Sequence, residues 1–376
     1  MFTRRVLTGA AALAVASLAL TACAGDGGDA GPSGDVDAAA ATSAQDFGGL
    51  EGLVEAAQEE GELNVIALPE TWANYGEIIA AFEEKYDITV NSADPDVSSA
   101  EEIQAAENLK GQDTAPDVFD LGSAVALDSL DYFAPYQVET WDDIPADHKE
   151  STGLWVYDYT GVMSIGYDED AVPEPEGLED LLDADYKGKV AINGDPTQAG
   201  AAAAAVQLAA LQSGGSADDI QPGIDFFGEL NSAGNFLPLD PTPATIASGE
   251  TPVVFDWSYN NLAEAKANEG QREWKVTILP GAAVGSYYNQ AINVDAPHPA
   301  AARLWQEFIF SDEAQNLYLA GGAFPVRLDA MVEAGTVDED ALADLGDAPE
   351  ELVQFTAEQT EAASALLAAE WAAAIR

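Results

Sequence analysis

Residues 63–90 read LNVIALPETWANYGEIIAAFEEKYDITV, and this stretch decides the fold. Its first six residues are a short apolar run, which is typical of a buried strand. The segment from Tyr75 to Lys85 has Ile78, Ile79 and Phe82 on one helical face, so it predicts an amphipathic helix. The last three residues, Ile-Thr-Val, predict a second strand. A strand, a helix and a strand in this order indicate a parallel pair joined by a crossover helix.

The same alternation continues along the chain. Further predicted strands cover residues 117–121, 161–167, 188–192, 252–255, 275–279 and 290–294. Further predicted helices cover residues 98–109, 178–182, 200–212, 224–230, 259–267, 300–310 and 312–319, and we expect the chain beyond residue 319 to be helical throughout. The sequence therefore predicts an α/β fold with a parallel sheet.

The composition predicts an extensive core and excludes several kinds of site. Hydrophobic residues make up 47% and aromatic residues 9% of the 376 residues, which is enough for one large or two medium domains. With 13 basic and 67 acidic residues, the formal net charge is −54, so we expect no binding to nucleic acid. Because the chain has a single cysteine, a disulfide framework and a thiolate metal site are excluded.

The N-terminus has the features of an export signal. Arg4 and Arg5 precede an apolar run over residues 10–20, which is too short for a permanent membrane span. The run ends in Leu20-Thr21-Ala22-Cys23, which resembles the lipobox of bacterial lipoproteins. The arginine pair leaves both Sec and twin-arginine export open.

The lipobox resemblance implies an address for the protein. A signal peptide of residues 1–22 is removed, and lipid such as palmitate is attached to Cys23. Residues 23–47 are the lipidated cysteine and a linker rich in small and polar residues, which we expect to be flexible. The folded part is then held on the outer face of the cell membrane, at the cell surface or in the periplasm.

Six segments in a fixed order carry a second resemblance. They are residues 63–90, 115–122 (APDVFDLG), 161–170 (GVMSIGYDED), 186–200 (YKGKVAINGDPTQAG), 248–263 (SGETPVVFDWSYNNLA) and 290–327 (QAINVDAPHPAAARLWQEFIFSDEAQNLYLAGGAFPVR). In this order they resemble the extracellular solute-binding proteins of bacterial ABC importers, of the polyamine and iron type. The resemblance implies a type II periplasmic-binding-protein fold, with two α/β lobes joined by crossover hinge strands. It assigns residues 48–160 and 289–376, with the C-terminal helices, to lobe 1 and residues 161–288 to lobe 2.

The resemblance also implies a function. Such a protein holds a small-molecule ligand between two lobes that close on it, and it delivers the ligand to an ABC permease in the membrane. We expect a monomer that is not an enzyme and has no catalytic residue, metal site or cofactor.

Candidate ligand-binding residues follow the predicted strands, since a ligand of an open α/β sheet binds beyond the carboxyl ends of its strands. They are Glu70, Trp72, Asp120, Ser123, Thr197, Gln198, Asp256, Trp257 and Ser258, together with Tyr287 and Tyr288 near a hinge crossing. Neighbours on a strand face opposite ways, so only one of the two tyrosines is expected to face the ligand.

These candidates are mainly aromatic and acidic. The rings of Trp72, Trp257 and a tyrosine could surround an ammonium group, and Asp120 or Asp256 could pair with it. The sequence therefore favours a cationic or amine-bearing solute of polyamine type.

Four alternatives remain open, and one of them is a purely structural surface lipoprotein that shows no ligand-induced closure. Iron binders of this family carry adjacent tyrosines after the strand at residues 252–255, but Asp256-Trp257-Ser258-Tyr259 stands there, which breaks the pattern. The helix start at residues 194–200, with Thr197, could hold a phosphonate or another anion, or Asp195 and Thr197 could be ordinary helix caps. An exported enzyme is the fourth alternative, although His148 and His298 lack partners at a fixed spacing and are expected at the surface.

Overall fold

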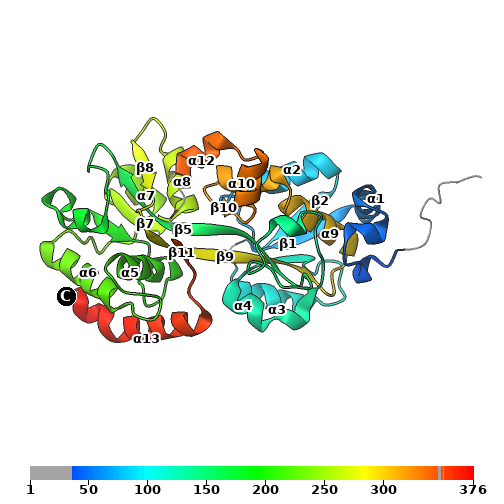
Figure 1. The fold of residues 1–376 in the computed structure, drawn as a ribbon, viewed down its shortest axis with the longest axis horizontal. Coiled ribbons are helices and arrows are strands. Elements are labelled where there is room, and N and C mark those ends of the chain that lie inside the picture. The colour runs from blue at the N-terminus through cyan, green and yellow to red at the C-terminus, as the bar shows by residue number, and fades with distance from the viewer. Residues whose placement is uncertain (1–35, 96, 346–348, 350) are drawn as a thin grey trace, which may run out of the picture. The chain divides into compact units, whose positions relative to one another are not determined.

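Figure 1 shows the fold in a computed structural model of the chain, which describes residues 36–95, 97–345, 349 and 351–376. The expected signal peptide and the expected lipid site at Cys23 lie outside the described residues. No helix among the described residues is both long enough and apolar enough to cross a membrane.

The predicted strand, helix and strand of residues 63–90 are confirmed. Strands β1 (Glu62–Ile66) and β2 (Thr89–Ala93) pair in parallel, and α2 (Tyr75–Tyr86) connects them. Tyr75, Ile78 and Phe82 are fully buried, because their spacing puts all three on the face of α2 that meets the core.

The remaining strands of the described residues form a nine-stranded sheet. They are β3 (Val118–Gly122), β4 (Phe133–Ala134), β5 (Val156–Asp168), β6 (Val190–Ile192), β7 (Val253–Trp257), β8 (Trp274–Thr277), β9 (Ala282–Asn293), β10 (Phe324–Pro325) and β11 (Glu351–Val353). The order is β11-β9-β5-β7-β6, with β3 and β4 on β9 and with β8 and β10 on β5. This sheet is mixed rather than parallel as expected, because the long strand β9 runs against β3, β4 and β5.

The helices follow the predicted alternation. They are α1 (Leu50–Glu60), α3 (Ser99–Leu109), α4 (Ser123–Asp128), α5 (Gly200–Gln212), α6 (Gln221–Ala233), α7 (Pro243–Ser248), α8 (Ser258–Ala267), α9 (Pro299–Ile309), α10 (Asp312–Ala320), α11 (Leu328–Ala334), α12 (Glu339–Leu345) and α13 (Ala357–Ala374). Short 3-10 helices cover Ala38–Ala40, Ala44–Phe47, Leu130–Tyr132, Trp141–Asp143, Leu178–Leu182 and Ala184–Tyr186. The expectation of a wholly helical C-terminus is wrong, because β10 pairs with β5 and β11 adds to the edge of β9.

Two long antiparallel strands, β5 and β9, run side by side through the middle of the described fold (Figure 1). Strand β5 pairs with β9 between Val156 and Val162 and with β7 between Met163 and Tyr167, so it belongs to both halves of the sheet. A β-bulge between Tyr157 and Thr160 shifts the register of β5 against β9. A bulge of this kind changes the face to which the following side chains point.

Two large hydrophobic cores lie along these strands. The first core includes Phe82, Trp305 and Phe308, and the second includes Phe227 and Phe255. Trp257, at the end of β7, is half-buried and packs against both cores. The two cores agree with the two-lobed α/β architecture that the family resemblance implies.

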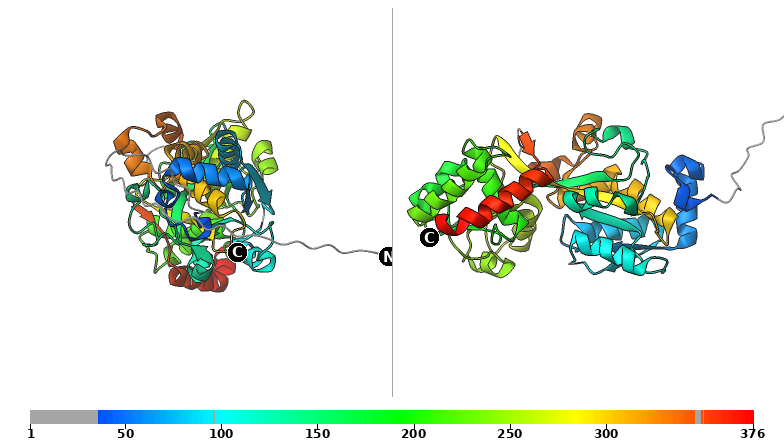
Figure 2. Two further views of the ribbon diagram at one scale, coloured as in Figure 1. Left: turned by 90° about the vertical axis from the view of Figure 1, so that its right-hand side faces the viewer. Right: turned by 90° about the horizontal axis from the view of Figure 1, so that it is seen from below.

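Two expected boundaries need correction. The family resemblance implies that α13 belongs to the first lobe, but the ring of Trp371 packs against Phe227 and Phe236 in the second core. Helix α13 lies along α6 (Figure 2). The flexible linker was expected to reach residue 47, but Phe47 is buried in the first core. The guanidinium of Arg303 also donates to backbone carbonyls of that segment, so residues 38–47 are part of the folded protein.

Candidate functional site

Four aromatic side chains from distant parts of the chain meet beside the two long strands. We call Trp72, Tyr159, Tyr259 and Tyr288 the aromatic cluster. The ring centroid of Trp72 lies 4.9 Å from that of Tyr259 and 5.8 Å from that of Tyr288. Tyr159 stacks on Tyr288 at 5.6 Å with an interplanar angle of 9°. Tyr159 and Tyr259 are buried, whereas Trp72 and Tyr288 are half-buried and form the accessible part of the cluster.

Trp257 lies next to this cluster. A Cβ atom added to Gly161 of β5 would come within 2.5 Å of Cε1 of Tyr259 and 3.4 Å of the Trp257 ring, so both rings lie against the same glycine. The sequence places glycine there because a larger side chain would occupy the space of the rings. Trp257 therefore belongs to the same site as Trp72.

Two buried carboxylates lie behind the aromatic cluster. Asp120 of β3 is 4% exposed and Asp158 of β5 is fully buried. The hydroxyl oxygen of Tyr75 lies 2.8 Å from Oδ2 of Asp120 and 3.2 Å from Oδ2 of Asp158. The hydroxyl of Tyr318 and the amide of Gln290 also donate to Asp158, at 3.0 and 3.1 Å. This acid pair is thus held by neutral donors.

The acid pair has an unusual electrostatic environment. None of the ion pairs among the described residues involves Asp120 or Asp158, and Oδ1 of Asp120 is buried without a hydrogen-bond partner. Burial raises the pKa of Asp120 well above its usual range, and the neighbouring charge of Asp158 raises it further. Burial raises the pKa of Asp158 to about 6. The site therefore has a deficit of positive charge that an added cation would relieve.

Asp256 is a third buried acid, at the end of β7. It is 8% exposed and accepts hydrogen bonds from the amide of Asn193, from the backbone N–H of Trp257 and from the amide of Asn260, at 2.8, 2.8 and 3.2 Å. Burial raises its pKa to about 6. Because both of its oxygens have partners, Asp256 differs from Asp120, which keeps one oxygen unpaired.

The two neighbouring tyrosines of β9 face opposite sides of the sheet. Tyr288 joins the aromatic cluster, whereas Tyr287 stacks on Tyr157 at 4.7 Å with an interplanar angle of 10° and lies 4.6 Å from the ring of His148. Tyr157 and Tyr159 also point to opposite faces, because the bulge between them breaks the alternation of β5. The structure thus brings Tyr288 to Trp72 and keeps Tyr287 away from it.

The two serine candidates use their hydroxyls within the protein. Oγ of Ser123 accepts hydrogen bonds from the amides of Asn289 and Gln354, at 3.0 and 3.2 Å. Ser258 is fully buried and donates to the carbonyl of Gly322 at 2.7 Å. Both hydroxyls therefore have structural partners within the protein.

The remaining candidates lie at exposed positions. Glu70 is exposed in the turn before α2. Thr197 and Gln198 are exposed, and Oδ1 of Asp195 accepts from both the backbone N–H and the hydroxyl of Thr197, at 2.9 and 2.7 Å. Neither Asp195 nor Thr197 caps α5, whose N-cap is Ala199.

Sequence reasoning missed several members of the site. The candidates from the sequence do not include Tyr75, Asp158, Tyr159, Tyr259, Gln290 or Tyr318. The predicted strand began at residue 161, whereas β5 begins at Val156. One signal in the sequence points to Asp158: it is an acid between aromatic and apolar residues in WVYDYTGVM, residues 155–163. An acidic side chain inside a buried strand needs hydrogen-bond partners, which makes it a candidate for a site.

The expectation of a surface position is wrong for His298. His298 is 9% exposed, and its Nδ1 lies 2.9 Å from Oδ2 of Asp117, which raises the pKa of His298. His148 is half-buried against Tyr157 and Tyr287. Neither histidine is part of a group that could hold a metal ion, and the structure contains no such group among the described residues.

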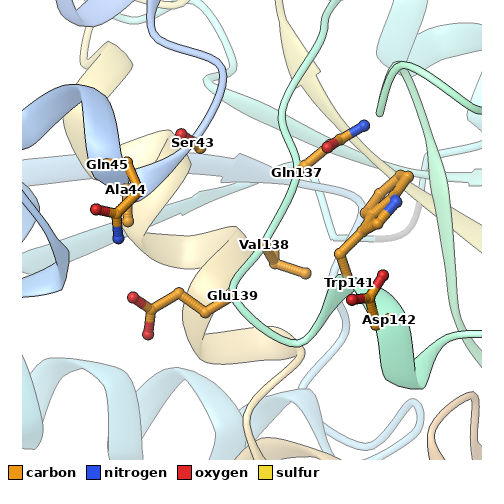
Figure 3. Close-up of a pocket in the computed structure, with 8 residues that line it drawn as sticks. All are labelled: Ser43, Ala44, Gln45, Gln137, Val138, Glu139, Trp141 and Asp142. Carbon is orange, nitrogen blue, oxygen red and sulfur yellow. The ribbon is translucent and has the colours of Figure 1, made fainter.

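A separate cavity of about 550 Å³ lies beside the first core, between residues 43–45 and residues 137–142, which follow β4 (Figure 3). It is lined by Ser43, Ala44, Gln45, Gln137, Val138, Glu139, Trp141 and Asp142. None of the candidate ligand residues lines it. The ammonium of Lys149 already lies 4.5 Å from the Trp141 ring centroid, so this tryptophan has a cationic partner within the protein.

Comparison with known proteins agrees with the fold and identifies the family. Residues 115–348 match the family model described as bacterial extracellular solute-binding protein. No curated protein matches the chain.

Solved structures share the fold over most of the chain. An ABC transporter substrate-binding protein from Bradyrhizobium japonicum has 15% identity and a TM-score of 0.63, covering 84% of this chain and 100% of its own. A spermidine/putrescine ABC transporter substrate-binding protein from Streptococcus pneumoniae has 14% identity and a TM-score of 0.61, covering 84% and 99%. A Bordetella ferric binding protein has 19% identity and a TM-score of 0.57, covering 82% and 98%. These likenesses confirm the periplasmic-binding-protein architecture.

The family model spans more than half of the chain, and its matched region contains Asp120, Asp158, Trp257 and Tyr288. The chain belongs to the bacterial extracellular solute-binding proteins.

Proposed function

We propose that this protein is the lipid-anchored solute-binding component of an ABC importer and that its solute is an organic cation with amine groups, of polyamine type. The two lobes close on the solute between the two cores, and the closed monomer delivers it to a membrane permease. The solute contacts both lobes in the closed form and only one lobe in the open form, so it binds the closed form more tightly and thereby favours closure.

The observation that carries the proposal is the combination of accessible rings with uncompensated acids. Trp72, Trp257 and Tyr288 are half-buried; all three pack against the first core, and Trp257 also packs against the second. Asp120 and Asp158 lie behind them without a basic partner among the described residues. Rings attract a cation through their negative faces, and buried carboxylates add a field of the same sign.

The magnitudes are consistent with useful affinity. A micromolar dissociation constant corresponds to about 8 kcal/mol. Three cation–π contacts of about 1 to 2 kcal/mol each supply roughly half of that. The carboxylates must supply much of the remainder, so a neutral solute of the same shape should bind far more weakly.

Anionic and ferric solutes fit this site less well. At the start of α5, the N–H and hydroxyl of Thr197 are already bonded to Asp195, whose carboxylate would repel an anion. For ferric iron, adjacent tyrosines are lacking after β7, and Tyr287 and Tyr288 face opposite sides of β9. Among the fold relatives, the spermidine/putrescine protein is therefore the better guide to the solute.

Calorimetric titration of the full chain tests the solute class. Putrescine, spermidine and choline represent the proposed cations, and 2-aminoethylphosphonate, ferric citrate and a maltooligosaccharide represent the other classes. We expect saturable binding of at least one amine in the micromolar range or tighter. Saturable binding of ferric citrate or the oligosaccharide, with no binding of any amine, would contradict the proposal.

The anchor is tested separately from the solute. Cys23→Ala should release the protein into the medium or stop its maturation, because the variant lacks the sulfur to which lipid would be attached. Labelling with a fatty-acid analogue should mark the unaltered chain only. Membrane retention of the variant without any label would refute lipid anchoring and leave the solute proposal intact.

A further inference from the structure

Resting on the proposed function, we infer that Asp120 and Asp158 form the counter-charge of the solute site and that a bound cation takes the place of a proton that this pair holds in the ligand-free protein. Solute capture is then an exchange of a cation for a proton. The acids act from behind the aromatic cluster, so the inference does not require the solute to touch them.

The geometry makes it costly for the pair to carry two negative charges. Oδ2 of Asp120 and Oδ2 of Asp158 both lie within hydrogen-bond distance of one hydroxyl, that of Tyr75. That hydroxyl has one proton, so it cannot donate to both oxygens at once. Two buried carboxylates this close, without a cation, retain a proton at a pH where exposed acids have lost theirs.

Within the part of the chain that the structure describes, no basic side chain forms an ion pair with Asp120 or Asp158. The side chains that face the pair are the hydroxyls of Tyr75 from α2, Tyr159 from β5 and Tyr318 from α10, and the amide of Gln290 from β9. Tyr288 from β9 and Tyr259 from α8 lie farther out. A third acidic side chain lies at this place: Glu102 of α3 is 1% exposed and accepts from the backbone N–H of Asp120 at 3.3 Å.

A hydrogen-bonded chain connects the pair to the accessible ring. Nε1 of Trp72 donates to the hydroxyl of Tyr159 at 2.7 Å, and that hydroxyl lies 3.5 Å from Oδ2 of Asp120. The indole nitrogen is therefore no farther than about 6 Å from the carboxylate, so the Trp72 ring lies close to the acid pair. The protein between them screens charges far less than water does. A cation on the face of Trp72 or Tyr288 favours the ionised pair, and the proton leaves for solvent.

Asp256 is the competing source of a proton. It lies at the other side of the site, next to Trp257, and it is nearly as buried as Asp120. Both of its oxygens accept hydrogen bonds from amides, whereas Oδ1 of Asp120 has no partner and Asp120 shares one hydroxyl with Asp158, so we assign the exchanged proton to the pair.

The experiment counts protons. Calorimetric titrations of the full chain with putrescine and with choline are run at pH 6 in two buffers of different ionisation enthalpy, and then from pH 5 to pH 7.5 in one buffer. Both probes keep their charge across this range, so any proton comes from the protein or the buffer. We expect release of about half a proton or more per bound cation near pH 6. Below pH 6, the affinity should fall by up to about tenfold for each pH unit.

Variants assign the proton. Asp120→Asn and Asp158→Asn should each flatten the pH dependence and abolish the release. Asp256→Asn should keep the release, whatever affinity remains. Glu307→Gln is the matched control, because Glu307 is a buried acid of the first core whose pKa burial raises to about 7, and it contacts Tyr136 and the backbone of Glu139 rather than the site.

The outcomes separate this inference from the proposed function. Binding of a cation without proton release, at an affinity that does not vary with pH, overturns the inference and leaves the amine site standing. Release that persists in Asp120→Asn and disappears in Asp256→Asn also overturns it. Failure of every amine to bind at any pH overturns the proposed function itself. If Asp158→Asn does not fold, proton release measured with Asp120→Asn and with the unaltered chain still tests the inference.

Discussion

Replacing Trp257 by alanine tests whether the ring at the boundary of the two cores binds the solute. The backbone N–H of Trp257 donates to Asp256 at 2.8 Å, and alanine retains that bond, so only the ring is lost. A cation–π contact of about 1 to 2 kcal/mol corresponds to a fivefold to thirtyfold loss of affinity. Because Trp257 also packs against both cores, we expect an additional loss of about 2 kcal/mol in the free energy of unfolding.

Calorimetry with putrescine or choline measures the first effect, and urea unfolding measures the second. Trp257→Phe retains a ring face and should lose less affinity than the alanine variant. Trp141→Ala is the matched control, since Trp141 is half-buried but lies in the separate cavity with Lys149. If Trp257→Ala binds as tightly as the unaltered folded protein, the ring is not part of the solute site.

Three further changes test packing at the site, the docking of the N-terminal segment and a buried pair of His298 with Asp117. Gly161→Ala should weaken cation binding several-fold and lower the free energy of unfolding by about 1 to 3 kcal/mol, because its methyl group would lie 2.5 Å from Tyr259. If calorimetry and unfolding give unchanged values, this packing is refuted. Arg303→Met should lower the free energy of unfolding by about 3 kcal/mol and expose the segment before residue 48 to proteolysis, since the buried guanidinium holds three backbone carbonyls. His298→Gln should lower the free energy of unfolding more at pH 5.5 than at pH 8.5. The hydrogen bond to Asp117 raises the pKa of His298, so the charged pair stabilises the fold below about pH 6.5. This stabilisation is lost as the pH rises through the folded-state pKa of His298. Equal losses at both pH values would exclude a role for that charge.

Much of the fold was predictable because its signals are local. The alternation of apolar runs and amphipathic segments predicted α2, β1 and most other elements, since the repeat of apolar residues in a strand or a helix involves only residues close in sequence. Segments that depend on remote partners were predicted less well. Strand β11 is three residues long and exists because it pairs with β9. The docking of α13 depends on contacts of the Trp371 ring with Phe227 and Phe236. Residues near Trp371 in the sequence do not reveal these contacts.

The candidate site was predicted in part for the same reason. The rule that ligands bind after strands selected Trp72, Asp120 and Trp257, which the fold brings near one another. Alternation along a strand correctly separated Tyr287 from Tyr288. The same alternation would put Tyr157 and Tyr159 on one face, but the bulge in β5 sends them to opposite faces. A bulge depends on pairing with β9, so the sequence of β5 alone does not reveal it.

The sequence by itself determined the α/β class, the family resemblance, the absence of cysteine beyond residue 23 and the set of aromatic and acidic residues from which a cation site could be built. Only the tertiary structure decided which of these residues act together. Asp158 and Tyr75 are 83 positions apart in the chain, yet their side chains lie 3.2 Å from each other, and Asp120 shares the same hydroxyl. The physical reason is that a carboxylate's chemistry depends on its surroundings. Burial, a neighbouring charge and an unpaired oxygen come from contacts between distant segments, and these contacts exist only in the folded chain.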